Sequence, residues 1–264
     1  MRRHLALLAA EFARGWAIMK RYWANELSFA ITVYLIFLMM VFMGGAMAGQ
    51  AVPNELKASA LVGILVWQLS MGCLGVLGWS YFNEAATGTL EHLYLSPLGV
   101  TRVFLARSVV DFFRQLLVMA FSATLAMVTM GITLKLPLPE LAVILPLAVA
   151  GMYGWGFMLA ALTLTVKRTQ NVMQLLQFFF LFFSGSVMPL EQMHWTIRYF
   201  GQTLPISAGI VALRKVTIEG ARLGELGDLL VQMAATSVLW LVIGVAIYTL
   251  ADRRARLKGS IGQY

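Results

Sequence analysis

Six long apolar stretches constrain the fold of this chain more than any other feature of its sequence. Each comes close to the length, about 20 residues, that an α-helix needs to cross the hydrocarbon core of a bilayer. Charged residues or proline and glycine clusters bound each stretch. In order, they cover residues 29–49, 58–82, 112–131, 141–166, 172–188 and 229–250. Pro146 falls inside the fourth, where a membrane helix tolerates proline as a kink. We therefore predict an all-α, polytopic membrane protein with six transmembrane helices.

Composition argues against a soluble fold. Of the 264 residues, 60% are hydrophobic and only 12% are charged, whereas soluble domains carry about 25% charged residues. Because the six spans and their short connections occupy almost the whole length, no separate aqueous domain fits. We predict a single transmembrane domain over residues 1–264.

The lysine and arginine residues divide unevenly between the two sides that six spans define. Fourteen lie on the side that carries both termini, and six lie on the other side. The six are Lys57, Lys135, Arg198, Arg214, Lys215 and Arg222. Because cytoplasmic loops carry the positive excess, we predict a multi-pass protein of the cytoplasmic (inner) membrane with both termini in the cytoplasm. The charges flank spans, so we expect anionic lipids, and no nucleic acid, as partners of this basic surface.

The first 27 residues have the pattern of an amphipathic helix. At helical spacing one stripe is apolar, and Arg14 and Arg21 lie off it. The stripe consists of Leu5, Leu8, Phe12, Trp16, Met19 and Trp23. We predict an interfacial helix over residues 1–27 that lies in the membrane surface. It is either a simple anchor or also a contact for a cytoplasmic partner.

Ionisable residues are absent from the middles of all six predicted spans. Carriers driven by protons or ions usually place such groups there, so this absence argues against a secondary carrier. Asp111 and Arg114 come nearest, three residues apart at the cytoplasmic end of the third span, where we expect an interfacial ion pair. The sequence indicates no catalytic group, and its three histidines are too scattered to form a metal site. It also lacks the glycine-rich loop that binds ATP phosphates, so any ATP must be bound by another chain.

The segment after the second span, residues 84–98, is predicted to form a short amphipathic helix in a cytoplasmic loop. Thr87 or Thr89 can cap its start, and Pro97 ends it. Its other candidate residues are Leu90, Leu93 and Leu98 on an apolar side, and Ser96 beside the proline. A hairpin on the membrane surface is one explanation. Acidic Glu84 and Glu91, however, suit contact with a soluble protein better than contact with an anionic leaflet.

Residues 184–228, between the fifth and sixth predicted spans, are too apolar for a solvated loop, and yet glycine and proline break them repeatedly. The breaks are Gly185, Pro189, Gly201, Pro205 and Gly209. We predict a pair of short re-entrant helices that dip into the outer leaflet, which membranes allow when the irregular backbone is buried in protein. The alternative is an amphipathic hairpin that lies flat outside.

Two motifs in these segments resemble the membrane subunits of type-2 ATP-binding-cassette exporters, the group that contains drug, polysaccharide and lipid exporters. The first is Glu84 through Pro97, which is similar to the family pattern "E...GTLE.L..SP". The second runs from Phe183 to Pro189 and is followed by Leu204-Pro205 and by Leu213-Arg214 through Gly220. The resemblance covers nearly the whole chain. One departure is His194, which stands where the family has a second proline.

The resemblance implies a coupling role for Glu84, Thr87, Thr89, Leu90, Glu91, Leu93, Ser96 and Pro97, which would dock on a separate ATPase subunit. It implies that Gly185, Pro189, Trp195 and Pro205 belong to external re-entrant helices that gate the pathway. ATP and Mg²⁺ would be bound by the partner ATPase, so this chain would hold no cofactor and would not be an enzyme. Two copies, or this chain and a paralogue, would form an export pathway as a dimer; export itself rests on the resemblance alone.

Aromatic and methionine side chains at Phe179, Phe183 and Met188 suit the wall of a pathway for a lipidic or drug-like cargo. Phenylalanine runs in membrane helices also serve as lipid-facing or packing residues. Two further classes of function stay open, namely a secondary carrier and a membrane scaffold or assembly protein without transport activity.

Overall fold

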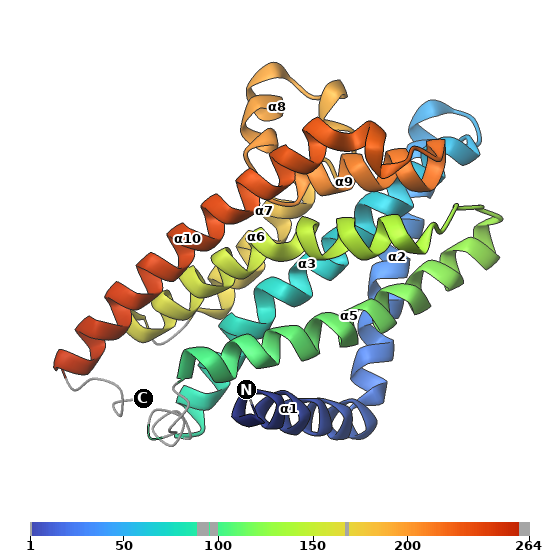
Figure 1. Ribbon diagram of the computed structural model, residues 1–264. Coiled ribbons are helices and arrows are strands. Elements are labelled where there is room, and N and C mark those ends of the chain that lie inside the picture. Colours follow the sequence, from blue (N-terminus) through green and yellow to red (C-terminus); the bar gives the residue numbers. More distant parts are fainter. Residues whose placement is uncertain (1, 89–94, 96–99, 167–168, 259–264) are drawn as a thin grey trace.

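The computed structural model describes residues 2–88, 95, 100–166 and 169–258, and all regular structure in these ranges is helical (Figure 1). The α-helices are α1 (Arg2–Arg21), α2 (Trp23–Ala48), α3 (Asn54–Ala86), α5 (Val100–Met130), α6 (Leu138–Thr165), α7 (Gln170–Phe183), α8 (Trp195–Gln202), α9 (Ser207–Arg214) and α10 (Gly227–Lys258). Two 3₁₀ turns, η1 (Leu190–Gln192) and η3 (Leu223–Leu226), and one π-helical turn, η2 (Lys215–Glu219), connect the last four. The predicted all-α class is confirmed in these ranges.

Five helices in the described part of the chain are long and apolar enough to cross a membrane, namely α2, α3, α5, α6 and α10. The predicted count of six is not confirmed. Its fifth span, residues 172–188, overlaps α7, which begins at Gln170 and has only 14 residues. At 1.5 Å per residue, such a helix is about 21 Å long, whereas the hydrocarbon core is about 30 Å thick. The chain leaves α7 at Ser184, and Gly185 follows with a left-handed φ of 85°.

Helix α6 lies at the centre of the bundle and packs against α3, α9 and, over most of its length, α10. It runs through Pro146 without ending, as the sequence predicts. Gly154 of α6 and Gly244 of α10 let these helices approach until backbone touches backbone. A Cβ atom at Gly244 would lie 2.6 Å from Gly154 Cα, and one at Gly154 would lie 2.7 Å from Leu241 N. Small residues that admit close backbone approach are the usual means by which membrane helices associate.

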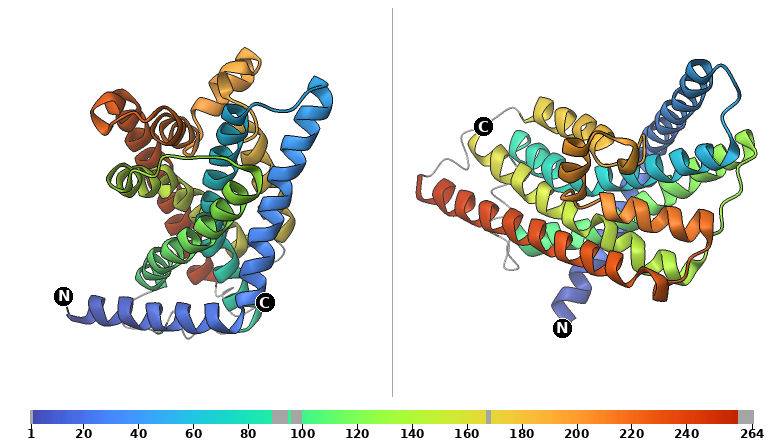
Figure 2. Two further views of the ribbon diagram at one scale, coloured as in Figure 1. Left: turned by 90° about the vertical axis from the view of Figure 1, so that its right-hand side faces the viewer. Right: turned by 90° about the horizontal axis from the view of Figure 1, so that it is seen from above.

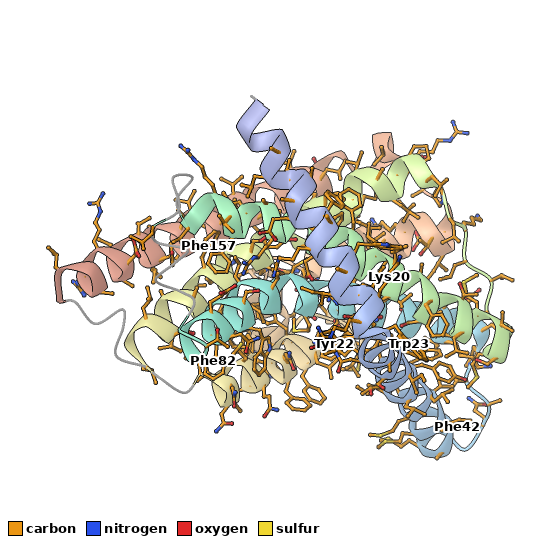
Figure 3. All side chains as sticks on the ribbon, turned by 90° about the horizontal axis from the view of Figure 1, so that it is seen from below. Lys20, Tyr22, Trp23, Phe42, Phe82 and Phe157 are labelled. Atoms are coloured by element: carbon orange, nitrogen blue, oxygen red, sulfur yellow. The ribbon has the colours of Figure 1, made fainter. Side chains whose placement is uncertain are left out.

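Helix α1 lies across one end of the bundle and turns into α2 at Tyr22 (Figures 2 and 3). Helix α2 therefore begins at Trp23, inside the segment predicted as interfacial and well before residue 29. Tyr22 and Trp23 lie at this corner, beside Lys20 (Figure 3). Phe12 and Trp16 of the predicted apolar stripe are exposed, at 43% and 54%. Part of the stripe is thus exposed, as expected of a helix that rests in a membrane surface, and the Phe12 ring also contacts Phe113 of α5, with the ring centroids 6.0 Å apart.

Connections between the long helices alternate between two ends of the bundle (Figure 1). One end carries α1, the start of α5 and the end of α10. The other end carries the α2–α3 and α5–α6 connections together with α9 and η2. A backbone hydrogen bond from Lys135 N to Thr217 O, 2.9 Å long, ties the α5–α6 connection to η2 at this second end.

Candidate functional site

Helix α3 ends at Ala86, and its last turn carries the first residue of the predicted coupling segment. The Glu84 carboxylate does not point away from the chain. Its Oε1 accepts a hydrogen bond of 2.8 Å from Arg107 Nη1 on α5. Thr87 donates its hydroxyl to Asn83 O, 2.8 Å away, and so closes the end of α3. Residues Thr89 to Tyr94 and Ser96 to Gly99, which hold Leu90, Glu91, Leu93 and Pro97, lie outside the described residues.

Arg107 connects α3 to the interfacial helix α1. Its side chain is 8% exposed, and its Nε lies 3.5 Å from Glu11, whose own side chain is 9% exposed. Glu11 also accepts a 2.8 Å bond from Arg14 Nε, one turn along α1. Because Gly15 lies on the same face of α1 as Glu11, the helix approaches Val110 of α5 closely there. The Glu11–Arg107 ion pair therefore holds α1 on the bundle, together with the ring contact between Phe12 and Phe113.

A second ion-pair group lies two turns further along α5. Arg114 pairs with Asp111 of its own helix and with Glu26 of α2, and its Nε donates 2.8 Å to Asp111 Oδ1. The predicted Asp111–Arg114 pair is thus confirmed, and Glu26 is added to it. Arg107, Asp111 and Arg114 follow one another at spacings of four and three residues, which places them on one face of α5.

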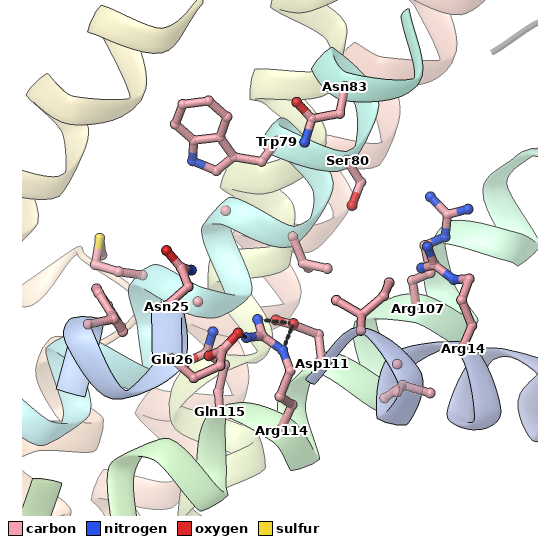
Figure 4. Close-up of a pocket in the computed structure, with 18 of the residues that line it drawn as sticks. Arg14, Asn25, Glu26, Trp79, Ser80, Asn83, Arg107, Asp111, Arg114 and Gln115 are labelled. Atoms are coloured by element: carbon pink, nitrogen blue, oxygen red, sulfur yellow. Dashed lines mark hydrogen bonds and ion pairs between the residues drawn. The ribbon is translucent and has the colours of Figure 1, made fainter. Parts of the chain in front are cut away.

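These two groups line a cavity of about 770 Å³ between α1, α2, α3 and α5, with Gln177 of α7 also in its wall (Figure 4). Asp111, Arg114 and Gln115 lie together on one side of it, opposite Trp79 and Asn83 of α3 (Figure 4). This volume falls within the range of about 300–1,000 Å³ that small-molecule sites occupy. This cavity could not be predicted from the sequence, because the charged residues that line it come from the ends of separate helices.

Helix α7 carries the predicted pathway residues on a partly exposed aromatic face. The rings of Phe179 and Phe183 stack with their centroids 5.0 Å apart, and Phe200 of α8 meets the Phe179 ring edge-on at 5.6 Å. A shallow groove of about 450 Å³ runs along this face between leucine and phenylalanine side chains. Met188 lies beyond the end of α7 and is 40% exposed.

The broken segment after α7 divides into an outer and an inner part. Helix α8 is the outer part, and its Trp195 is 65% exposed. Helix α9 is the inner part, with Ile210 fully buried, and it packs against α3, α6 and α10. Pro205 is buried against α6, where a Cβ at Gly151 would approach its ring.

Arg214, at the end of α9, fixes this inner part to its neighbours. Its Nε donates to Ser59 O of α3 at 3.1 Å, and its Nη2 donates to Gly185 O at 2.9 Å. Burial lowers the pKa of Arg214 to about 10, and the nearby Glu191 carboxylate opposes that shift. The guanidinium therefore stays charged at neutral pH. Arg214 and Gly185 are thus joined by a hydrogen bond. Pro205 lies at the same end of the bundle, which is remote from α1.

No group of three or more histidine, cysteine, aspartate or glutamate side chains within the described ranges could hold a metal ion. Cys73 is free and fully buried within α3, where it packs in the apolar core.

The sequence profile of the family described as "ABC-2 family transporter protein" matches residues 50–251. This range runs from just before α3 to near the end of α10 and leaves α1 and α2 outside it. No curated protein is similar enough in sequence to count as a relative of the chain.

Proposed function

The chain belongs to the ABC-2 family of transporter proteins, and we propose that it is the permease subunit of an ATP-driven exporter, active as a dimer with a separate ATPase. The match over residues 50–251 carries the proposal, because it includes four of the five described helices that are long enough to cross a membrane, with α10 matched to near its end. Permeases of this family are membrane components and not themselves catalytic, so the energy must come from a partner. ATP and Mg²⁺ would be bound there.

We further propose that the α1 end of the bundle faces the cytoplasm. Both chain ends belong to that side, and it holds fourteen of the lysine and arginine residues. Helix α7 together with residues 184–188 would make the remaining crossing, with α8 and α9 on the external side. Irregular backbone is acceptable at that depth only where protein buries it, and Ser184, Gly185 and Ser186 are all buried.

Single cysteines placed in a Cys73→Ala background are expected to show this orientation. The exposed positions Asn54 and Glu219 should react with an impermeant thiol reagent from outside intact cells, whereas the exposed positions Thr87 and Gln170 should react only after lysis. Reversed labelling would contradict the orientation, and labelling of Gln170 and Glu219 from the same side would contradict the crossing formed by α7.

The segment that follows α3 is the proposed contact for the ATPase. Glu84 is held by Arg107 on α5, so a push on this segment would reach α5 and, through Glu11, the interfacial helix α1. These ion pairs could therefore transmit a movement of the ATPase to the membrane helices. Glu91, seven residues further along, is the carboxylate proposed to meet a basic group of the ATPase.

Glu91→Arg is expected to uncouple the complex. Truncating one partner of a buried, hydrogen-bonded charge pair at an interface costs about 2–5 kcal/mol, so the variant should insert normally but retain much less ATPase on co-purification. Glu55→Arg is the matched control, because Glu55 is exposed at the opposite end of α3. Equal ATPase recovery with both variants would remove Glu91 from the interface.

The aromatic face of α7 is proposed as a wall of the export pathway. Phe179 and Phe183 present a continuous apolar surface with Phe200, and the groove beside it has almost no polar lining. A second copy or a paralogue packed against this face would enclose it.

A further inference from the structure

Helix α1 has two faces, and the bundle covers one of them. Glu11 and Gly15 lie on the covered face, where Glu11 pairs with Arg107 and Gly15 approaches α5. An α-helix turns by about 100° per residue, so Lys20, nine residues after Glu11, lies half a turn away from it. Lys20 is exposed, and Trp16, one turn before it, is 54% exposed. The face of α1 that points away from the bundle thus carries an aromatic ring and a cation.

Cations and aromatic rings gather where α1 turns into α2, and Figure 3 shows Lys20, Tyr22 and Trp23 there. The Lys20 ammonium lies 5.5 Å from the centroid of the Trp16 ring, and the Arg21 guanidinium lies 5.9 Å from that of Tyr22. We call this exposed group the α1 corner; it consists of Trp16, Lys20, Arg21, Tyr22 and Trp23. Among the described residues, neither Lys20 nor Arg21 forms an ion pair. Two positive charges of the corner are therefore left without a counter-charge from that part of the chain.

The length of α2 places the α1 corner at the depth of the lipid headgroups. Helix α2 begins at Trp23 and has 26 residues, which corresponds to about 39 Å. The hydrocarbon core is about 30 Å thick, and the headgroup layer adds roughly 5–8 Å on each side. About 9 Å of α2 therefore extends beyond the core. Residues 23–28 include Asn25, Glu26 and Ser28, whereas the apolar run begins at Phe29, so the excess belongs to the end that joins α1.

We propose that the α1 corner binds the headgroups of anionic phospholipids. Their phosphates supply the counter-charge that Lys20 and Arg21 lack among the described residues. An acidic soluble protein would also supply charge, but tryptophan and tyrosine rings favour the interface between hydrocarbon and water, and Trp16 and Trp23 are exposed at this depth. The inference goes beyond the proposed export function and does not depend on it, because it requires only that α2 crosses the membrane.

Fluorescence quenching in lipid nanodiscs tests this on the purified full chain without any ATPase. A fluorophore is attached to a single cysteine at the exposed position Ala17, in a Cys73→Ala background. The discs consist of phosphatidylcholine with a small fraction of either 5-doxyl phosphatidylglycerol or 5-doxyl phosphatidylcholine as the quencher. One lysine or arginine near an anionic surface favours binding about fivefold. We therefore expect the anionic quencher to be enriched at least about fivefold at the fluorophore, relative to the zwitterionic one.

Variants locate the site. Lys20→Gln combined with Arg21→Gln should abolish the enrichment. Arg253→Gln combined with Arg254→Gln, which removes two exposed cations of α10 at the same end of the bundle, should leave it unchanged. Lys20→Glu combined with Arg21→Glu should exclude the anionic quencher, so that it quenches less than the zwitterionic one.

Three results would each overturn the proposal. They are equal quenching by both lipids in the unaltered chain, enrichment that persists when Lys20 and Arg21 are replaced, and equal loss of enrichment with the two pairs of glutamine variants. If the unaltered chain enriches no lipid, and replacing Lys20 and Arg21 instead releases the ATPase, the α1 corner contacts an acidic protein surface and not the membrane.

Discussion

Replacing Gly244 by alanine is expected to separate α6 from α10 and to destabilise the protein by about 3 kcal/mol or more. Overpacking a core typically costs about 1–3 kcal/mol, and here the added methyl group meets backbone, which cannot rotate away. Its carbon would lie 2.6 Å from Gly154 Cα and closer still to the Gly154 carbonyl group. The measurement is the thermal unfolding temperature and the yield of monodisperse protein in detergent. Gly154→Ala should behave in the same way, since its methyl group would meet Trp240 O.

Gly227→Ala is the matched control on the same helix. Nothing in the described ranges lies within 4 Å of a Cβ added there, and alanine favours helix over glycine by up to about 1 kcal/mol. It should therefore be neutral or stabilising. Equal unfolding temperatures for Gly244→Ala and Gly227→Ala would contradict the close packing of α6 on α10.

Arg107→Met is expected to cost about 3–5 kcal/mol, the usual loss when one partner of a buried ion pair is removed. Methionine keeps much of the volume of the arginine stem, but it leaves the carboxylates of Glu11 and Glu84 without the guanidinium that lies between them. Helix α1 should then detach from α5. Unfolding temperature reports the stability. Accessibility to a thiol reagent of a cysteine at Val110, a buried residue of α5 that Gly15 of α1 approaches, reports the detachment in a Cys73→Ala background.

Two variants test the origin of that loss. Arg198→Met removes an exposed arginine from α8 and should change stability by no more than about 0.5 kcal/mol. Arg107→Met combined with Glu84→Gln should lose less than the two single variants together, because the second change removes a repelling charge. If Arg107→Met is as stable as Arg198→Met, the ion pairs contribute little to the docking of α1.

The long helices could be predicted from the sequence because the bilayer fixes their length and composition. The end of α7 could not. Its apolar run continues through Val187 and Met188, and hydropathy does not register the left-handed backbone at Gly185 that interrupts the helix. The Asp111–Arg114 pair could be predicted because three residues on a helix bring side chains together.

Contacts between distant residues were not accessible from local patterns. The periodicity of residues 1–27 identified the apolar stripe of α1, but Glu11 is buried because of Arg107, which is 96 residues away. Glu84 was predicted to face an ATPase, and its internal pairing with Arg107 depends likewise on packing of α3 against α5. The cavity also results from the packing of helices that are distant in the sequence. The local sequence pattern that points to it is the spacing of Arg107, Asp111 and Arg114, which places them on one face of α5.

ATP dependence of the reconstituted chain is the most direct test of the proposed permease function. In proteoliposomes the purified chain alone should hydrolyse no ATP above background. With its cognate ATPase, it should retain that subunit and support hydrolysis-dependent movement of cargo across the bilayer. A scaffold would retain no ATPase and move nothing. Strong transport by the isolated chain, driven by a pH or sodium gradient without ATP, would contradict the permease assignment and favour a secondary carrier.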